Sequence, residues 1–156
     1  MSDFELCPDV RLAVPDDLPG ILALMKEACA ENSSHPMNEL KVLDMCMRHF
    51  NKQGAMLAVI GEPGTPVAYC LSIIDQIWYS DDYQLLELSL FVSETHRKST
   101  YAKQLLEFLK TSSESLRLDL TCGVFSNSRT EAKVRLYARK LPQVGAFFCF
   151  HPSVAN

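Results

Sequence analysis

The chain has 156 residues, of which 47% are hydrophobic and 22% are charged, and this composition is typical of a single globular domain. Its formal net charge is −4, whereas a general nucleic-acid-binding module usually carries an excess of basic residues. No run of about 18 uninterrupted apolar residues is present, and the N-terminal segment lacks the basic and apolar regions of a secretory signal. We therefore expect one cytoplasmic domain over residues 1–156, with neither nucleic acid nor membrane as a partner.

The first third of the chain predicts a short strand followed by two helices. Residues 10–14, VRLAV, have a strand pattern, and Asp16 or Asp17 is suited to cap the helix that follows. Apolar residues at i, i+3, i+4 and i+7 over 21–28 form one helical stripe, and a second amphipathic helix is expected over 40–50.

The middle third predicts three strands. Residues 56–61 and 67–75 flank a turn rich in Gly and Pro and are expected to form a hairpin. Residues 85–92, LLELSLFV, are apolar on one face and mostly apolar on the other, which is typical of a strand in the middle of a sheet. Strict alternation places Glu87 on the same face as Phe91.

The last third predicts a helix over 100–116, a strand over 118–125, a helix over 128–141 and a final strand over 145–150. The complete order, β-α-α-β-β-β-α-β-α-β, predicts an α/β fold with a mixed sheet flanked by helices.

Six cysteines are spread through the chain without a C-x-x-C pair, and a chain of this length does not need disulfides to be stable. We expect reduced thiols that are mostly buried as small apolar residues, with Cys70 and Cys122 in the core. Neither the cysteines nor the histidines have metal-site spacing, so no metal is expected.

The turn that joins the central strand to the third helix contains Arg97, Lys98, Ser99 and Thr100. The first N–H groups of a helix are unsatisfied donors at the positive end of its dipole, so such a turn is suited to bind phosphate. The same residues also fit a solvated loop with a simple N-cap, and both interpretations stay open at this point.

The segment LSLFVSETHRKSTYAKQLL resembles the acetyl-CoA-binding motif of the GNAT family of N-acetyltransferases, in which a strand is followed by R-x-x-G-x-G/A and a helix. Arg97 and Ala102 match this motif, whereas Thr100 stands at the usual glycine, where a Cβ narrows the space for a pyrophosphate and disfavours a positive φ. The resemblance implies acetyl-CoA as cosubstrate. It also implies the residues that bind it, namely Leu90, Phe91, Val92, Arg97, Lys98, Ser99, Thr100, Tyr101, Ala102, Lys103 and Asn127.

Two further segments extend the resemblance over nearly the whole chain. Arg11, Ala13, Asp17 and Ile21 match an R-x-A and D-x-x-x-I pattern in the first strand and helix of the family. The segment GVFSNSRTEAKVRLYARKL resembles the later strand, asparagine and tyrosine-bearing helix. Its long spacing between asparagine and tyrosine resembles that of phage- or prophage-encoded members.

The resemblance implies roles for three parts of the chain in acetyl transfer. A backbone N–H of the central strand, here within 90–92, would stabilise the oxyanion. Tyr137 matches the general acid that protonates the leaving thiolate, although its place in an apolar helical stripe also suits a core aromatic residue. Glu87, the one acid inside the apolar central strand, is the candidate base because burial raises the pKa of a carboxyl. A structural carboxylate with buried partners is the alternative.

We therefore expect an acetyl-CoA-dependent N-acetyltransferase that passes the acetyl group directly to a primary amine of a small molecule or peptide. Because the family often forms dimers, the resemblance also implies a homodimer. The alternative is a degenerate member that binds CoA or a protein partner without catalysis, and Thr100 is the feature that favours it. The acceptor is not identified by the sequence. One acidic and aromatic cluster is suited to hold a cationic amine, although such a stretch is more often a solvated loop: Trp78, Tyr79, Asp81, Asp82 and Tyr83.

Overall fold

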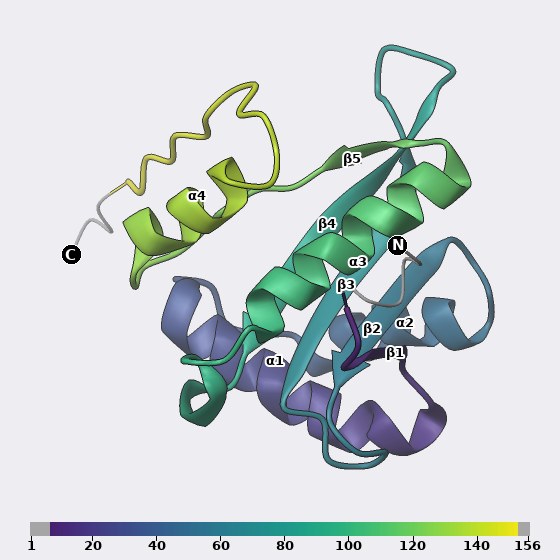
Figure 1. The fold of residues 1–156 in the computed structure, drawn as a ribbon. Helices are drawn as coiled ribbons and strands as arrows, with labels where there is room; N and C mark the ends of the chain where they lie inside the picture. The colour runs from purple at the N-terminus through teal and green to yellow at the C-terminus, as the bar shows by residue number, and fades with distance from the viewer. Residues whose placement is uncertain (1–6, 153–156) are drawn as a thin grey trace.

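The computed structural model describes residues 7–152, and over these residues one five-stranded sheet has the order β1-β2-β3-β4-β5 (Figure 1). The strands are β1 (Val10–Leu12), β2 (Ala55–Ile60), β3 (Ala68–Gln76), β4 (Tyr83–Val92) and β5 (Asp119–Thr121). Neighbouring strands are antiparallel except β4 and β5, which are parallel. The predicted mixed sheet, flanked by helices, is confirmed.

The helices cover the two faces of the sheet and one of its edges (Figure 1). They are α1 (Leu18–Asn32), α2 (Glu39–Phe50), α3 (Tyr101–Leu116) and α4 (Thr130–Ala138), with short 3-10 turns η2 (Pro15–Asp17) and η3 (Glu94–His96). Helices α1 and α2 pack on one face against a cluster that includes Tyr69 and Phe91. Helix α3 packs on the other face against a second cluster that includes Cys70 and Leu85.

A β-bulge changes which face of β4 each side chain occupies. Leu71 of β3 pairs with Ser89, but Ser72 pairs with Glu87, so Leu88 is an extra residue in β4. The predicted placement of Glu87 on the same face as Phe91 is therefore wrong. Phe91 packs with α1 and α2, whereas Glu87 hydrogen-bonds Tyr137, which packs with the cluster on the α3 side. Strict alternation fails because one inserted residue reverses every later side chain.

The final strand predicted over 145–150 is also wrong, because these residues form no strand. Phe148 is 95% exposed and Phe150 is 86% exposed. An apolar run becomes a strand only where a neighbouring strand offers backbone partners, and no described strand pairs with this segment. The strands β1 and β5 are present but shorter than predicted.

An ion pair ties the start of α1 to β1. The guanidinium of Arg11 donates two hydrogen bonds to the carboxylate of Asp17, of 2.7 and 2.8 Å. The same carboxylate accepts from the backbone N–H groups of Val14 (2.8 Å) and Gly64 (2.9 Å). Asp17 is the residue that precedes α1, as predicted, but its fully buried side chain makes these bonds instead of capping the helix. The bond from Arg11 holds the pKa of Asp17 near 2.

The cysteines are less buried than the sequence predicts. Cys46 and Cys70 are buried, Cys29 and Cys122 are half-buried, and Cys149 is exposed. Cys70 lies in the core as expected. Cys122 follows β5 at the edge of the core, because the strand predicted to contain it ends at Thr121.

Candidate active site

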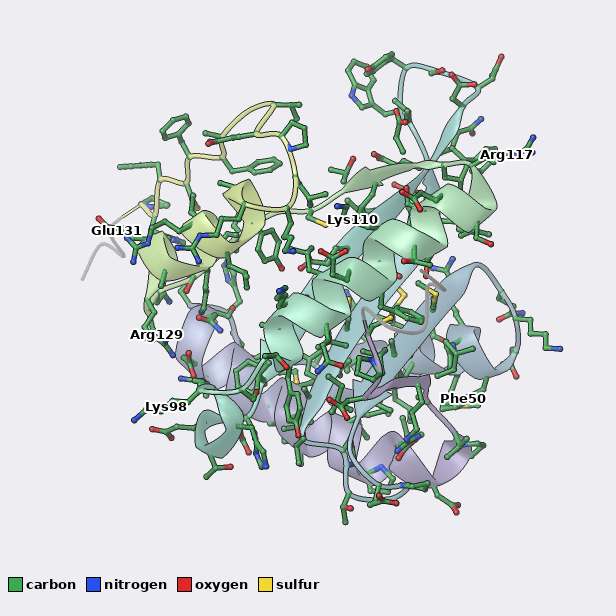
Figure 2. All side chains as sticks on the ribbon, viewed as in Figure 1. Phe50, Lys98, Lys110, Arg117, Arg129 and Glu131 are labelled. Atoms are coloured by element: carbon green, nitrogen blue, oxygen red, sulfur yellow. The ribbon has the colours of Figure 1, made fainter. Side chains whose placement is uncertain are left out.

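The strands β4 and β5 pair over three residues and then separate. Leu86 pairs with Thr121, and from Glu87 to Val92 no residue of β5 lies beside β4. A cavity of about 900 Å³ occupies this opening. Its walls come from the end of β4, the C-terminal end of α1, the turn before α3, the loop after β5 and helix α4. Figure 2 shows the elements around it, with Arg129 at the start of α4 on the same side of the molecule as Lys98.

The structure brings most of the predicted site residues to this one cavity. Three do not line it: Lys98, Thr100 and Tyr101. Those that do are Glu87, Leu90, Phe91, Val92, Arg97, Ser99, Ala102, Lys103, Asn127 and Tyr137.

The two predicted catalytic residues contact each other. The hydroxyl of Tyr137 donates a hydrogen bond of 2.9 Å to Oε2 of Glu87. Burial raises the pKa of Glu87 to about 7, although hydrogen bonds from Tyr137 and the thiol of Cys122 oppose that rise. Burial and the neighbouring Glu87 charge raise the pKa of Tyr137 well above its usual range. Near pH 7 the pair therefore combines a phenol that keeps its proton with a carboxyl that is able to gain or lose one.

Replacing Glu87 with Gln is expected to stabilise the fold at pH 8 and leave it nearly unchanged at pH 4. Because folding raises the pKa of Glu87 from 4.5 to about 7, the folded wild type loses stability as the pH rises through this interval. Gln carries no charge to bury, so the gain at pH 8 is on the order of 1–3 kcal/mol. Urea unfolding at both pH values measures it. The exposed Glu131→Gln on α4 is the matched control, and a gain that does not depend on pH would contradict the prediction.

The turn before α3 is held by its own side chains. Nε of Arg97 donates to the carbonyl oxygen of Val92 (3.4 Å), and its guanidinium lies 5.5 Å from the ring centroid of Phe91. Arg97 also forms an ion pair with Glu31 of α1. The hydroxyl of Ser99 donates to the carbonyl of His96 and accepts from the N–H of Tyr101 at 3.3 Å. These contacts fix the turn that carries the first N–H groups of α3 to the cavity wall.

Thr100 does not strain or obstruct this turn. Its φ is −88°, so the position does not need the left-handed conformation that favours glycine. Its hydroxyl accepts a 2.9 Å hydrogen bond from the side chain of Gln104, and its side chain does not line the cavity. Tyr101 is stacked on His96 with centroids 6.0 Å apart, also outside the cavity.

A polar cluster that the sequence does not predict lies where α1 meets α4. Nζ of Lys133 donates to Oδ1 of Asn32 (3.0 Å) and to the hydroxyl of Ser126 (2.7 Å), and it lies 3.9 Å from Glu31. All four line the cavity, as does Arg129. Nothing in the local sequence pattern indicates that residues about 100 positions apart meet here. The loop of Trp78 to Tyr83, by contrast, contributes no lining residue, and Trp78 is 92% exposed.

Helix α4 carries Tyr137, but none of its residues is fully buried, so a few side-chain contacts hold the helix in place. One is Lys140, whose Nζ lies 2.7 Å from Oε1 of the buried Glu107 on α3. Replacing Lys140 with Met leaves that carboxylate without its nearest cation, a loss of about 1–3 kcal/mol. We expect faster hydrogen exchange over 130–141 with α3 unchanged. Arg135→Met removes an exposed pair of the same helix and should have no such effect; equal exchange in both variants would contradict the prediction.

Over residues 7–152, no three His, Cys, Asp or Glu side chains gather as metal ligands would. Within the same part of the chain, no helix combines the length and the apolar character needed to cross a bilayer.

Comparison with known proteins identifies the class of fold. No protein-family model and no curated protein matches the sequence. Solved structures do match, and the fold is that of acetyltransferases, as the resemblance to the GNAT family predicts.

Particular structures cover nearly the whole of this chain. An aminoglycoside 6'-N-acetyltransferase from Acinetobacter haemolyticus has a TM-score of 0.66 and 11% identity, over 94% of this chain and 99% of that one. AAC(6')-Iy, solved with the bisubstrate analogue CoA-S-monomethyl-acetylneamine, has a TM-score of 0.69 and 15% identity, over 94% and 98%. An aminoglycoside acetyltransferase from an uncultured soil metagenomic sample, in complex with sisomicin, has a TM-score of 0.65 and 14% identity, over 94% and 95%.

Proposed function

We propose that this protein is an acetyl-CoA-dependent N-acetyltransferase. The observation that carries the proposal is one cavity that has the Tyr137–Glu87 pair on its wall and a cationic helix turn at its edge. That the fold is shared with acetyltransferases, one of them bound to a CoA analogue, supports the same conclusion.

The residues present fit acetyl-CoA. Four cationic side chains line the cavity and are suited to its phosphates: Arg97, Lys103, Arg129 and Lys133. The first N–H groups of α3 add donors at the positive end of the helix dipole. Beyond Leu86, the edge of β4 that faces the cavity has no strand partner among the described residues, so its backbone groups remain for an extended ligand arm.

In the proposed reaction, Glu87 takes a proton from the acceptor ammonium, directly or through a water, and leaves a neutral amine. The amine forms a C–N bond with the acetyl carbonyl carbon, and a backbone N–H within 90–92 stabilises the oxyanion. As the C–S bond breaks, Tyr137 gives its proton to the leaving sulfur. Because Tyr137 and Glu87 share a hydrogen bond, the proton on Glu87 then restores the phenol. The nitrogen loses its second proton to water as the amide forms, so the net result is an amide, a free CoA thiol and one released proton.

Binding of acetyl-CoA is the first test. At about a hundred times Kd, a ligand adds roughly 2.7 kcal/mol of stability, which raises Tm by about 5–10 °C for a chain of this size. Lys103→Ala is expected to reduce the rise, whereas Lys98→Ala, which removes a cation outside the cavity, leaves it unchanged. No rise at millimolar acetyl-CoA would overturn the proposal and favour the non-catalytic module. The φ of −88° at Thr100 and its side chain outside the cavity support the catalytic proposal over that alternative.

A further inference from the structure

The side chains that line the cavity carry more positive than negative charge, whereas the whole chain has a net negative charge. The chain has a net charge of −4, yet the cavity is lined by four Arg or Lys residues and by two acids, Glu31 and Glu87. This contrast bears on the acceptor, because an amine with several ammonium groups needs a carboxylate or other acceptor for each one that it buries.

Glu31 is already neutralised by its neighbours. Its carboxylate forms ion pairs with Arg97 and, at 3.9 Å, with Lys133. A cationic acceptor would have to displace one of these two cations, which belong to the ordered cluster between α1, α3 and α4.

Glu87 is able to serve one amine only. It accepts the hydroxyl of Tyr137, and in the proposed reaction it takes the proton of the ammonium that reacts. A second ammonium on the same acceptor would find no unpaired carboxylate among the described lining residues. Arg97 donates to Glu31 through one terminal nitrogen and has a second terminal nitrogen for a phosphate, so this ion pair is kept when a cosubstrate binds.

Part of the cavity wall is aromatic. The rings of Phe125 and Phe147 lie 5.2 Å apart and line the cavity, although the two residues are 66% and 71% exposed. A Cβ on Gly123 would lie within 3.8 Å of both rings, so the two rings pack beside this glycine. The preceding residue, Cys122, hydrogen-bonds Glu87. Such rings are suited to cover an apolar or aromatic acceptor body.

We propose that the acceptor is a monoamine: one primary amine on an apolar or aromatic body that carries no second positive charge. This inference rests on the proposed acetyltransferase function. It separates the chain from its structural neighbour that is solved in complex with sisomicin, a polyamine.

The test compares acceptors that differ by one ammonium group. Thiol release from saturating acetyl-CoA is measured with hexylamine, 2-phenylethylamine, 1,6-diaminohexane and sisomicin. We expect kcat/KM for each monoamine to exceed that of the diamine by about ten-fold or more, with sisomicin lower still. A diamine or sisomicin that reacts as well as hexylamine would overturn this inference alone. No thiol release with any amine, although acetyl-CoA binds, would overturn this inference and the proposed function together.

A charge reversal in the cavity sharpens the comparison. Arg129→Glu supplies a carboxylate, and it should raise the ratio of diamine to monoamine kcat/KM by about ten-fold. Any effect on acetyl-CoA binding cancels in this ratio. Arg135→Glu makes the same change of charge on α4 outside the cavity and should leave the ratio unchanged. Equal ratios in the two variants would show that the charge at position 129 acts on the cosubstrate alone, and would contradict a role for the cations of the cavity in selecting the acceptor.

Discussion

Replacing Tyr137 with Phe is expected to lower turnover by about 10²–10³-fold, because the change removes one hydroxyl and leaves the ring in place. The hydroxyl is 2.9 Å from Glu87, while the ring packs against the apolar cluster on the α3 side of the sheet. Without the phenol, the leaving sulfur has no positioned proton donor, and Glu87 loses the group through which its proton is passed on. The measurement is kcat for thiol release at saturating acetyl-CoA and monoamine.

Two comparisons make this result specific. Tyr101→Phe removes a hydroxyl outside the cavity, on a ring that stacks against His96, and should retain wild-type turnover. The Tm rise with acetyl-CoA should persist in Tyr137→Phe, because the affected step is proton transfer and not binding. Turnover within error of the wild type would remove the acid role and leave Tyr137 as a packing residue.

Replacing Asp17 with Ala is expected to cost about 3–5 kcal/mol of folding stability. The variant would leave the Arg11 guanidinium without its carboxylate and the N–H groups of Val14 and Gly64 without an acceptor. Urea unfolding at pH 7 gives the difference. Asp16→Ala changes the exposed neighbouring acid and should cost less than about 1 kcal/mol. A similar loss in both variants would show that the ion pair contributes little.

The pH dependence of this ion pair has the opposite sign to that of Glu87. Folding lowers the pKa of Asp17 from 3.8 to about 2, so its contribution is complete above pH 3.8 and is lost as the pH falls through 2. The Glu87 penalty, in contrast, appears as the pH rises from 4.5 through 7. The acid limb of the stability profile should therefore change in Asp17→Ala, and the limb near neutrality in Glu87→Gln.

The order of helices and strands could be predicted from the sequence because it depends on local periodicity and on Gly- and Pro-rich breaks. The turn at Arg97 and the tyrosine at 137 were likewise visible as motifs. The bulge at Leu88 could not be predicted, because it depends on the register in which β4 pairs with β3. The strand predicted over 145–150 is absent for a similar reason. Its apolar pattern is typical of a strand, but no described strand lies beside it to form backbone hydrogen bonds.

The site itself was predicted as separate residues and not as an arrangement. Tyr137 and Glu87 are 50 positions apart. The role of each was predicted separately, from the motif around Tyr137 and from the apolar strand around Glu87. Their contact follows from the bulge, which turns Glu87 toward α4, and from the early end of β5. The Lys133 cluster was missed because its partners come from three distant segments that no single pattern connects.

The separation of β4 from β5 also has a consequence for how the chain folds. Strands β2, β3 and β4 are successive antiparallel neighbours, so their contacts close short loops and are expected to form early. The cavity walls depend on three parallel pairs between β4 and β5 and on helix α4, none of whose residues is fully buried. The chain is therefore expected to complete its central meander, β2 to β4, first and to assemble the cavity last. On mild heating, the elements around the cavity should unfold locally before strands β2, β3 and β4 do.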